Sequence, residues 1–236
     1  MRKDISVILP SYNEKENIVE AIERIDSSLG DRLLEMIVVD DNSPDRTWEL
    51  VENLDHPKVK LIRRETERGL ASALSRGIHE SGGRVVAWLD CDLGVPPEVI
   101  STLVSKLNEA DLAIASRFVE GGHDRRVFWV VWCSYLINRF AQVLLGSQIR
   151  DYTSGVIAVK REVLQKVPIN PTGFGEYFIE FVALAARKRF SIIEVGYEYR
   201  NRPAGYSKST GSLRTFFSLG VQYGFKVLAV RAKINC

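Results

Sequence analysis

Two carboxylates separated by one residue, Asp90 and Asp92, are the clearest candidates for a chemical role in this sequence. They follow residues 84–89, RVVAWL, which predict a buried strand. Neighbouring carboxylates repel each other, and partial burial raises the cost of their charges. A hard divalent cation such as Mg²⁺ or Mn²⁺ would offset that cost and could hold a diphosphate, because such ions prefer oxygen ligands. The alternative is structural: the two aspartates end the strand and cap the next helix.

Other polar residues also follow apolar segments. Asn13 comes after residues 5–10, Asp40 and Asp41 come at the end of residues 33–39, and Arg117 comes after residues 112–115. Apolar strands that alternate with helices indicate a parallel sheet covered on both faces, and ligands of such sheets lie beyond the carboxyl ends of the strands. We therefore expect an α/β fold with a mostly parallel sheet, and expect these residues at one edge.

The expected elements follow from apolar periodicity and from turn residues. Strands are expected at 5–10, 33–39, 59–62, 84–89, 112–115, 156–160 and 192–199. Helices are expected at 14–29 with Asn13 as cap, 47–54, 70–81, 96–108, 127–145, 176–188 and from 213 onward. Loops are expected at 121–126, 168–175 and 201–212.

Composition is ordinary for a globular protein: 236 residues with 45% apolar and 26% charged residues. The net charge of +2 gives no indication of nucleic-acid binding. Residues 200–236, however, hold seven lysines and arginines and no acidic residue. A basic tail of this kind suits phosphate groups or an anionic membrane surface.

The cysteines Cys91, Cys133 and Cys236 have neither disulfide nor metal-ligand spacing, which fits a reducing compartment. The N-terminus has no signal-peptide pattern. No unbroken apolar run of about 18 residues occurs, so we expect no standard transmembrane helix.

Seven short motifs occur in order along the chain. They are PSYNE at 10–14, DDNSPD at 40–45, RGL at 68–70, DCD at 90–92, SR at 116–117, DYTSG at 151–155 and RPAGYSK at 202–208. Together they resemble the family 2 glycosyltransferases with a GT-A (Rossmann-like) fold, and within them the polyprenyl-phosphate glycosyltransferases, whose type is dolichyl-phosphate mannose synthase. The resemblance covers nearly the whole chain and favours a ligand site at Asp90 and Asp92 over helix capping.

By this resemblance, a nucleotide diphosphate sugar would bind along the first half of the chain. Its pocket would be lined by Pro10, Tyr12, Glu14 and Asp41. Arg68 and Gly69 precede a helix, where free N–H groups and an arginine can steady a diphosphate. The alternatives are a structural turn at Asp40 and Asp41, with only a structural role for Asp40, and an ordinary glycine turn at Gly69.

The resemblance also assigns Asp90 and Asp92 to the metal, which would act as a Lewis acid on the leaving diphosphate. The sequence departs from the family at the next positions. Relatives often read D-x-D-x-Q, in which the glutamine can complete the ligand set of the metal. This chain has Gly94 in place of the glutamine and then Val95 in place of a polar residue. Either water replaces that ligand or the affinity for metal is lower.

The implied acceptor is a lipid monophosphate, whose oxygen is already anionic near pH 7. No strong general base is then needed, but cations must hold two phosphates together. The resemblance assigns this role to Arg117, Arg202 and Lys208, with Ser116 or Ser154 as hydrogen-bond donors. Further candidates, each with a solvated surface charge as the alternative, are Arg125 and Arg126, together with Arg139.

The expected helix at 127–145 is apolar on nearly every face. It is either a buried core helix or an interfacial one, with Trp129, Trp132 and Tyr135 in the headgroup zone. The basic helix from 213 onward could lie beside it as a second amphipathic helix. We therefore expect peripheral binding at the cytoplasmic face of a membrane, with or without an anchoring partner subunit.

The resemblance implies an inverting glycosyltransferase that moves a hexose, mannose as the first choice, from a nucleotide diphosphate sugar to a polyprenyl phosphate. Three alternatives stay open: glucose from UDP-glucose, transfer to a sugar hydroxyl with Glu180 or Asp151 as base, and a non-catalytic binding subunit. We expect one GT-A domain over 1–212 and a C-terminal helix over 213–236. Its halves are 1–118 for the nucleotide sugar and 119–236 for the acceptor.

Overall fold

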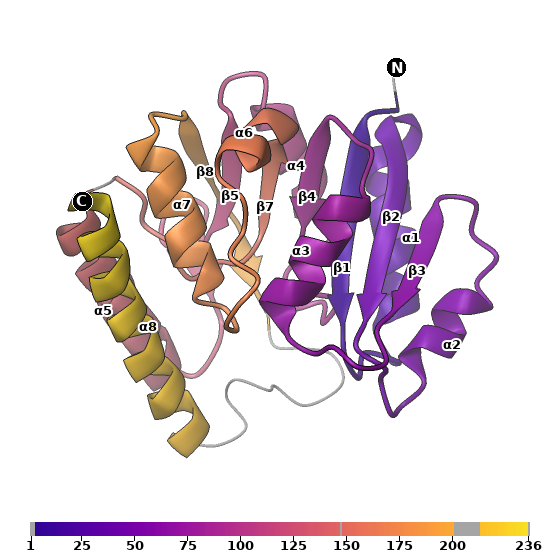
Figure 1. Ribbon diagram of the computed structural model, residues 1–236, viewed down its shortest axis with the longest axis horizontal. Coiled ribbons are helices and arrows are strands. Elements are labelled where there is room, and N and C mark those ends of the chain that lie inside the picture. The colour runs from indigo at the N-terminus through magenta and orange to yellow at the C-terminus, as the bar shows by residue number, and fades with distance from the viewer. Residues whose placement is uncertain (1–2, 147, 201–212, 236) are drawn as a thin grey trace.

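The computed structural model describes residues 3–146, 148–200 and 213–235, with the side chains of 220–234 in the last segment. Within these residues, seven strands form one sheet in the order β3-β2-β1-β4-β7-β5-β8 (Figure 1). The strands are β1 (Ile5–Ser11), β2 (Leu33–Asp40), β3 (Val59–Arg63), β4 (Val85–Trp88), β5 (Leu112–Ser116), β7 (Ile157–Lys160) and β8 (Ile192–Gly196). The expected α/β fold with a mostly parallel sheet is confirmed.

The strand β7 is the exception to the parallel arrangement. It lies between β4 and β5 and runs antiparallel to both, whereas the other neighbours in the sheet are parallel. An antiparallel strand presents its beginning, not its end, at the edge where the parallel strands finish. The segment 151–155 therefore reaches the same edge as residues that follow β1, β2 and β4.

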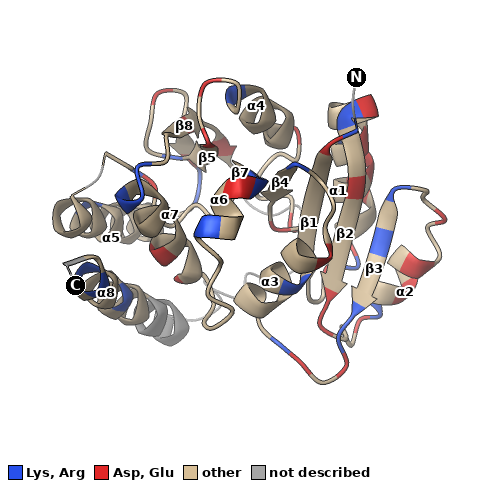
Figure 2. Cartoon of the chain, turned by 45° about the horizontal axis from the view of Figure 1, so that its top comes forward, with Lys and Arg blue, Asp and Glu red and all other residues tan. Residues whose placement is uncertain are grey.

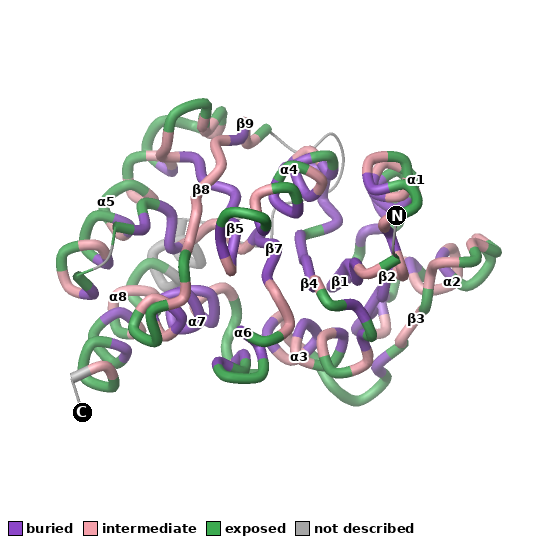
Figure 3. Tube along the Cα trace, turned by 90° about the horizontal axis from the view of Figure 1, so that it is seen from above, coloured by how far each residue is buried: buried purple, intermediate pink, exposed green. Residues whose placement is uncertain are grey.

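Helices cover both faces of the sheet (Figure 3). On one face α1 (Ile18–Leu29), α2 (Thr47–Glu52) and α4 (Val99–Lys106) enclose an apolar layer with one side of the strands. On the other face α3 (Leu70–Glu80), α6 (Arg161–Lys166) and α7 (Tyr177–Arg187) enclose a second layer that contains Trp88 and Phe181. A single 3₁₀ turn, Gly30–Arg32, joins α1 to β2.

Two helices begin later than their apolar pattern predicts. The helix α1 begins at Ile18, because residues 12–17 form a loop in which Asn13 has a left-handed backbone (φ 56°). Asn13 is therefore not its cap; Asn17 occupies that position and makes no side-chain capping bond. The helix α4 begins at Val99, after Pro96 and Pro97.

Three short elements were not expected. The helix α6 follows β7 directly, without a loop. The strands β6 (His123–Asp124) and β9 (Glu198–Tyr199) pair in parallel as a two-stranded ribbon. The expected loop at 121–126 and the end of the expected strand at 192–199 therefore form one structure.

The helices α5 (Phe128–Leu145) and α8 (Leu213–Asn235) pack on each other at the β8 end of the sheet (Figure 1). Most of α5 faces outward, with Phe128 80% and Val143 73% exposed, so the buried-helix alternative is wrong. Its single charged side chain is Arg139, and it is nearly uniformly uncharged in Figure 2. With a mean hydropathy of 1.3 over 18 residues, α5 is long and apolar enough to cross a membrane by length and composition alone, although no standard transmembrane helix was expected.

Candidate functional site

A cavity of about 470 Å³ opens where β1, β2 and β4 end and extends to α5 and α8. The strand ends and the loops after them contribute Pro10, Tyr12, Glu14, Asp41, Arg68, Gly69, Asp90 and Asp92. The opposite wall contributes Arg117, Arg126, Ser134, Ile137, Ser154, Phe174, Tyr197, Tyr199 and Tyr223. The residues predicted to hold the nucleotide and the metal, together with Arg117 and Ser154, therefore line this one cavity.

Arg202 and Lys208 lie outside the described residues. Two other strand-end residues, Asn13 and Ser116, are not among the lining residues. Of the three further arginine candidates, Arg126 lines the cavity, Arg125 pairs with Glu198, and Arg139 lies at a separate surface hollow along α5.

The loop after β1 is held by side chains of the loop after β2. The backbone N–H groups of Asn13, Glu14 and Lys15 donate to Ser43, Thr47 and Asp45, respectively, at 3.0 to 3.1 Å. Asp40 in turn accepts two bonds from Ser43, at 2.6 and 2.8 Å. Asp40 is fully buried, which raises the pKa of its carboxyl. Asp40 thus has the structural role given as the alternative: it holds Ser43, which in turn accepts the N–H of Asn13 in the loop after β1.

Asp41 points into the cavity and also fixes the neighbouring loop. One carboxylate oxygen pairs with the Arg64 guanidinium (Nε at 2.7 Å), and the other accepts the Gly69 N–H at 2.8 Å. Arg64 is 6% exposed and also donates to Ser72 and to the Gly69 carbonyl. Gly69 has φ 128°, which favours glycine, so this loop conformation requires it. The adjacent Arg68 places its guanidinium 5.6 Å from the Tyr12 ring centre.

Arg64 is a residue that sequence reasoning missed. The only signal was a pair of arginines, Arg63 and Arg64, at the end of β3. Their side chains diverge: Arg63 is exposed and lies 3.7 Å over the Trp48 ring, whereas Arg64 is buried against Asp41.

The two aspartates after β4 have different surroundings. Asp90 is exposed to the cavity, whereas Asp92 is 3% exposed and accepts the Gly94 N–H at 2.8 Å. Leu93, between Asp92 and Gly94, has a left-handed backbone (φ 57°), which turns the loop tightly. The donors are oxygens only, as a hard cation prefers, and within the described residues no cluster of three acidic, histidine or cysteine side chains occurs. The site therefore fits a cation that takes its remaining ligands from a diphosphate and water.

Tyr177, from α7, also lines the cavity, and it was not among the site residues predicted from the sequence. Its hydroxyl accepts the Trp88 indole N–H at 3.1 Å. Burial, and then the charge of Asp90, raise the pKa of Tyr177 well above its ordinary value, so the phenol stays neutral.

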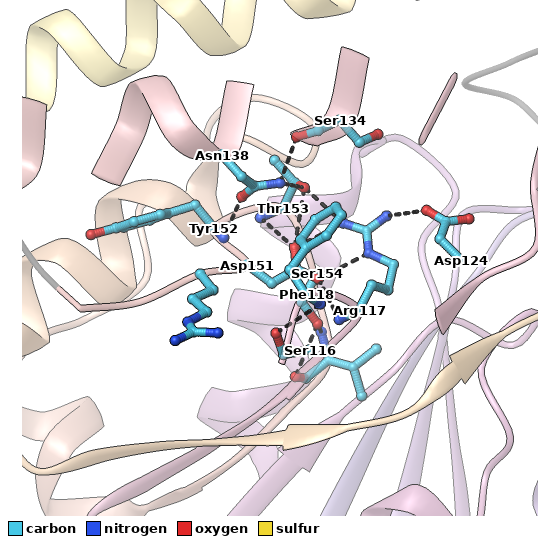
Figure 4. A network of polar contacts seen from close by, with 12 residues as sticks. Ser116, Arg117, Phe118, Asp124, Ser134, Asn138, Asp151, Tyr152, Thr153 and Ser154 are labelled. Carbon is cyan, nitrogen blue, oxygen red and sulfur yellow. Dashed lines mark hydrogen bonds and ion pairs between the residues drawn. The ribbon is translucent and has the colours of Figure 1, made fainter. Parts of the chain in front are cut away.

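Arg117 is the centre of a buried network (Figure 4). It donates two hydrogen bonds to the Asp151 carboxylate, from Nε at 2.9 Å and from Nη2 at 2.8 Å. It also donates to Thr153 at 2.8 Å, and its guanidinium lies 3.6 Å from the Asp124 carboxylate. Burial opposes its charge, but the charge and hydrogen bonds of Asp151 keep the pKa of Arg117 above its usual range. Asn138 of α5 joins the network by donating to Thr153 at 2.9 Å. The network thus ties α5 to the sheet edge.

Arg126 forms a second cationic point at the cavity. It pairs with Asp124 at 2.5 Å, and its guanidinium lies 4.9 Å over the Tyr199 ring. The β6–β9 ribbon brings these residues together, because Asp124 and Tyr199 are partners in its register. Arg117 and Arg126 thus share Asp124, and with Asp151 the cluster has two positive and two negative charges.

Neither carboxylate suggested as a base is available for that role. Asp151 is fully buried and held by Arg117. Glu180 does not line the cavity; it binds Lys226 at 2.5 Å and Lys233 at 2.8 Å, both from α8. Burial opposes its charge, but these lysines lower the pKa of Glu180 to about 2. Glu180 anchors the C-terminal helix.

Residues 6–168 match the family described as glycosyl transferase family 2. The chain is 40% identical over 218 residues to a dolichol-phosphate mannosyltransferase of Pyrococcus furiosus, covering 88% of this chain and 59% of the relative. It is 34% identical to a polyprenol monophosphomannose synthase of Mycolicibacterium smegmatis, covering 87% of this chain and 81% of the relative. It is 31% identical to a dolichol-phosphate mannosyltransferase of Saccharomyces cerevisiae, covering 90% and 84%.

A solved structure has a similar fold: glucosyl-3-phosphoglycerate synthase from Mycobacterium tuberculosis, in complex with Mn²⁺, UDP and glucosyl-3-phosphoglycerate. Its TM-score is 0.76 with 21% sequence identity, over 98% of this chain and 80% of that one. At this identity the likeness concerns the fold alone. The matched residues and the relatives together show that the chain is a glycosyltransferase and belongs to glycosyl transferase family 2.

Proposed function

We propose that the chain transfers mannose from GDP-mannose to a polyprenyl (dolichyl-type) phosphate, with inversion at the anomeric carbon. Inversion follows from a single in-line attack by the acceptor phosphate, opposite the leaving diphosphate. Relatives that are 30 to 40% identical are named for mannose and for dolichol, polyprenol or undecaprenyl phosphate, which supports mannose as the sugar and a polyprenyl phosphate as the acceptor.

The observation that carries this proposal is a single cavity with two unlike ends. At one end the exposed Asp90 and the buried Asp92 meet the nucleotide-side loops. At the other end α5 and α8 contribute Ile137 and Tyr223, and the outer faces of both helices are apolar. A nucleotide sugar and the phosphate end of a lipid can therefore occupy one space from opposite sides.

The metal proposal concerns the residues at the strand ends. Asp90 and Asp92 would hold Mg²⁺ or Mn²⁺, which supplies a Lewis acid for the departing diphosphate. Arg68, exposed beside Tyr12, would face the same diphosphate from the nucleotide side. Pro10, Glu14 and Asp41 would line the base and ribose pocket.

The chemistry of the opposite wall supports a phosphate as the acceptor group. Among the described residues the carboxylates that line the cavity are Glu14, Asp41, Asp90 and Asp92, all on the nucleotide side. The acceptor side offers Arg117 and Arg126 with Ser134 and Ser154. Cations without a carboxylate base suit a phosphate nucleophile, which is already deprotonated near pH 7, better than a sugar hydroxyl.

The membrane proposal concerns α5 and α8. Large apolar side chains are exposed on both helices: Phe128, Trp129, Trp132, Leu136, Phe140, Val143, Val221, Phe225 and Leu228. Aromatic residues beside a basic C-terminal helix suit the headgroup zone of a membrane. Peripheral binding at the cytoplasmic face, with or without an anchoring subunit, would deliver the lipid phosphate to the cavity.

The test is transfer of radiolabelled sugar to dolichyl phosphate in the presence of Mg²⁺ or Mn²⁺, with GDP-mannose and UDP-glucose compared. We expect mannose transfer, abolished by chelation. Glucose transfer would identify the alternative donor, and preference for a hydroxyl-bearing glycolipid would identify the alternative acceptor. No transfer by a folded protein that still binds nucleotide would overturn the enzyme proposal in favour of a binding subunit.

A further inference from the structure

Gly94 lies two residues after Asp92. Its backbone conformation does not require a glycine. It is absent from the glycines with positive φ, so an L-residue could adopt this conformation. Space explains it instead. A Cβ atom at position 94 would lie 2.9 Å from the Tyr199 hydroxyl oxygen and 3.0 Å from Asp92 Oδ1. The phenol of Tyr199 therefore occupies the room that a side chain would take beside Asp92.

The Tyr199 ring is held in this place by several contacts. Its strand β9 pairs with β6, and the N–H of the next residue, Arg200, donates to the Gly94 carbonyl at 2.9 Å. The Arg126 guanidinium lies over one face of the ring at 4.9 Å, and Tyr197 meets it edge-on at 6.5 Å. The ring cannot swing away without disturbing these contacts, so its hydroxyl position is defined by the fold.

We propose that the Tyr199 hydroxyl is a third oxygen of the Asp90 and Asp92 site and takes the ligand position that Gly94 leaves open. This inference rests on the proposed cation at those aspartates and deepens it. A phenol is neutral near pH 7, so it adds an oxygen without further repulsion between charges. It can serve the cation directly or through water, and it can donate to an oxygen of the diphosphate.

The same side chain links the two ends of the cavity. Its hydroxyl occupies the space that a side chain at position 94 would take, and the Arg126 guanidinium of the acceptor side lies over its ring. Tyr199 is in this sense a positioning residue as well as a candidate ligand.

The first test removes only the hydroxyl. Binding of Mn²⁺ in the presence of saturating GDP is followed by the electron paramagnetic resonance of the unbound ion. We expect Tyr199→Phe to weaken Mn²⁺ binding roughly tenfold, the effect of losing one hydrogen bond or ligand contact to a charged group. Tyr152→Phe makes the same change at a buried tyrosine outside the cavity and should leave Mn²⁺ affinity unchanged.

Asp92→Asn separates this inference from the proposed function. If the unaltered chain binds no Mn²⁺ with GDP, both ideas are overturned. If it binds Mn²⁺ and Asp92→Asn abolishes binding, while Tyr199→Phe matches the unaltered chain, the inference alone fails. Thermal unfolding of each variant checks that it is folded.

The second test changes position 94, alone and together with position 199. Gly94→Ala should push the ring aside and weaken Mn²⁺ binding by about as much as Tyr199→Phe, and the double variant should be no weaker than either single one, because both remove one contact. In a Tyr199→Ala background, Gly94→Gln places an amide oxygen in the vacated room and should restore binding. Full additivity together with no rescue would overturn the shared-space inference.

Discussion

The two walls of the cavity are built in opposite ways. The strand-end wall is made of short loops that satisfy one another: Asp41 with Arg64 and Gly69, and Asp40 with Ser43. The side chains of Asp40, Asp41, Ser43 and Arg64 are buried and paired before any ligand arrives. The helix wall presents large apolar side chains to the outside, such as Phe128 and Phe225, which are 80% and 68% exposed.

The difference fits the two substrates proposed above. A preorganised polar wall suits a water-soluble nucleotide, because its hydrogen-bond groups need no rearrangement on binding. An exposed apolar wall is unfavourable in water and favourable against lipid. The Arg117 network joins the walls, since it connects the sheet edge to α5 through Thr153 and Asn138. The variants below test each wall and this joint.

The largest effect is expected at the strand-end wall. Asp92→Asn should lower kcat/KM for transfer at least about 10³-fold, since loss of a charged metal ligand removes roughly 4 kcal/mol of transition-state stabilisation. The matched control, Asp31→Asn, changes an exposed aspartate far from the cavity and should keep full activity. Activity of Asp92→Asn within tenfold of the unaltered chain would contradict a metal role.

Changes in the Arg117 network should lower the free energy of unfolding. Asp151→Asn leaves the buried Arg117 without its main partner, and we expect the free energy of unfolding to fall by about 3–5 kcal/mol. Urea denaturation measures this loss. Glu109→Gln, which breaks the exposed pair with Lys106, should change it by less than about 0.5 kcal/mol. Equal effects of the two variants would show that the network does not support the fold.

Changes to the exposed apolar side chains of α5 should weaken membrane binding. Phe128→Glu combined with Trp132→Glu should weaken binding to vesicles with anionic lipid about 100-fold, because two large apolar side chains lose their burial, about 3 kcal/mol together. Co-sedimentation measures the bound fraction. Lys15→Glu changes the net charge equally at an exposed site away from α5, and its smaller effect gives the purely electrostatic part. If transfer to a short, water-soluble prenyl phosphate also fell, the helix would have a role beyond lipid contact.

The smallest effect concerns the attachment of α8. Glu180→Gln should lower the free energy of unfolding by about 2 kcal/mol, since it leaves Lys226 without its acidic partner. Because the folded pKa of Glu180 is about 2, below its unfolded value, its contribution is complete above about pH 4.5 and is lost as the pH falls toward 2. Stability measured across this range should decline less steeply for Glu180→Gln. Parallel pH curves would mean that other groups control the acid response.

The strand ends could be predicted because each strand is a continuous apolar run followed by a polar residue, and parallel strands finish at one edge. The antiparallel direction of β7 could not, since a short buried strand has the same pattern in either direction. The late start of α1 depends on contacts with Ser43 and Thr47, about 30 residues away. The partnership of Arg64 with Asp41 is equally non-local, and a ribbon of two residues per strand leaves no periodicity to detect.

The exposure of α5 lies between these cases. A helix that is apolar on all sides is compatible with a protein core or with a membrane surface, and the sequence pattern does not distinguish them. Only the packing of Val130, Asn138, Ala141 and Leu145 shows which narrow face is buried. The Gly94 departure was visible in the sequence, but its explanation by Tyr199 required the three-dimensional contact.

The central, reversed position of β7 has a consequence for how the chain folds during synthesis. Until residues 157–160 have left the ribosome, β4 lacks one neighbour and β5 has no partner among the residues already made. A nascent chain of about 150 residues therefore exposes open strand edges, which are prone to pair with other chains. The insertion of β7 closes the open edge of β4 and one edge of β5, and β8 then covers the other edge of β5. We expect the sheet to become resistant to protease only after this late event, with chaperones engaged until then.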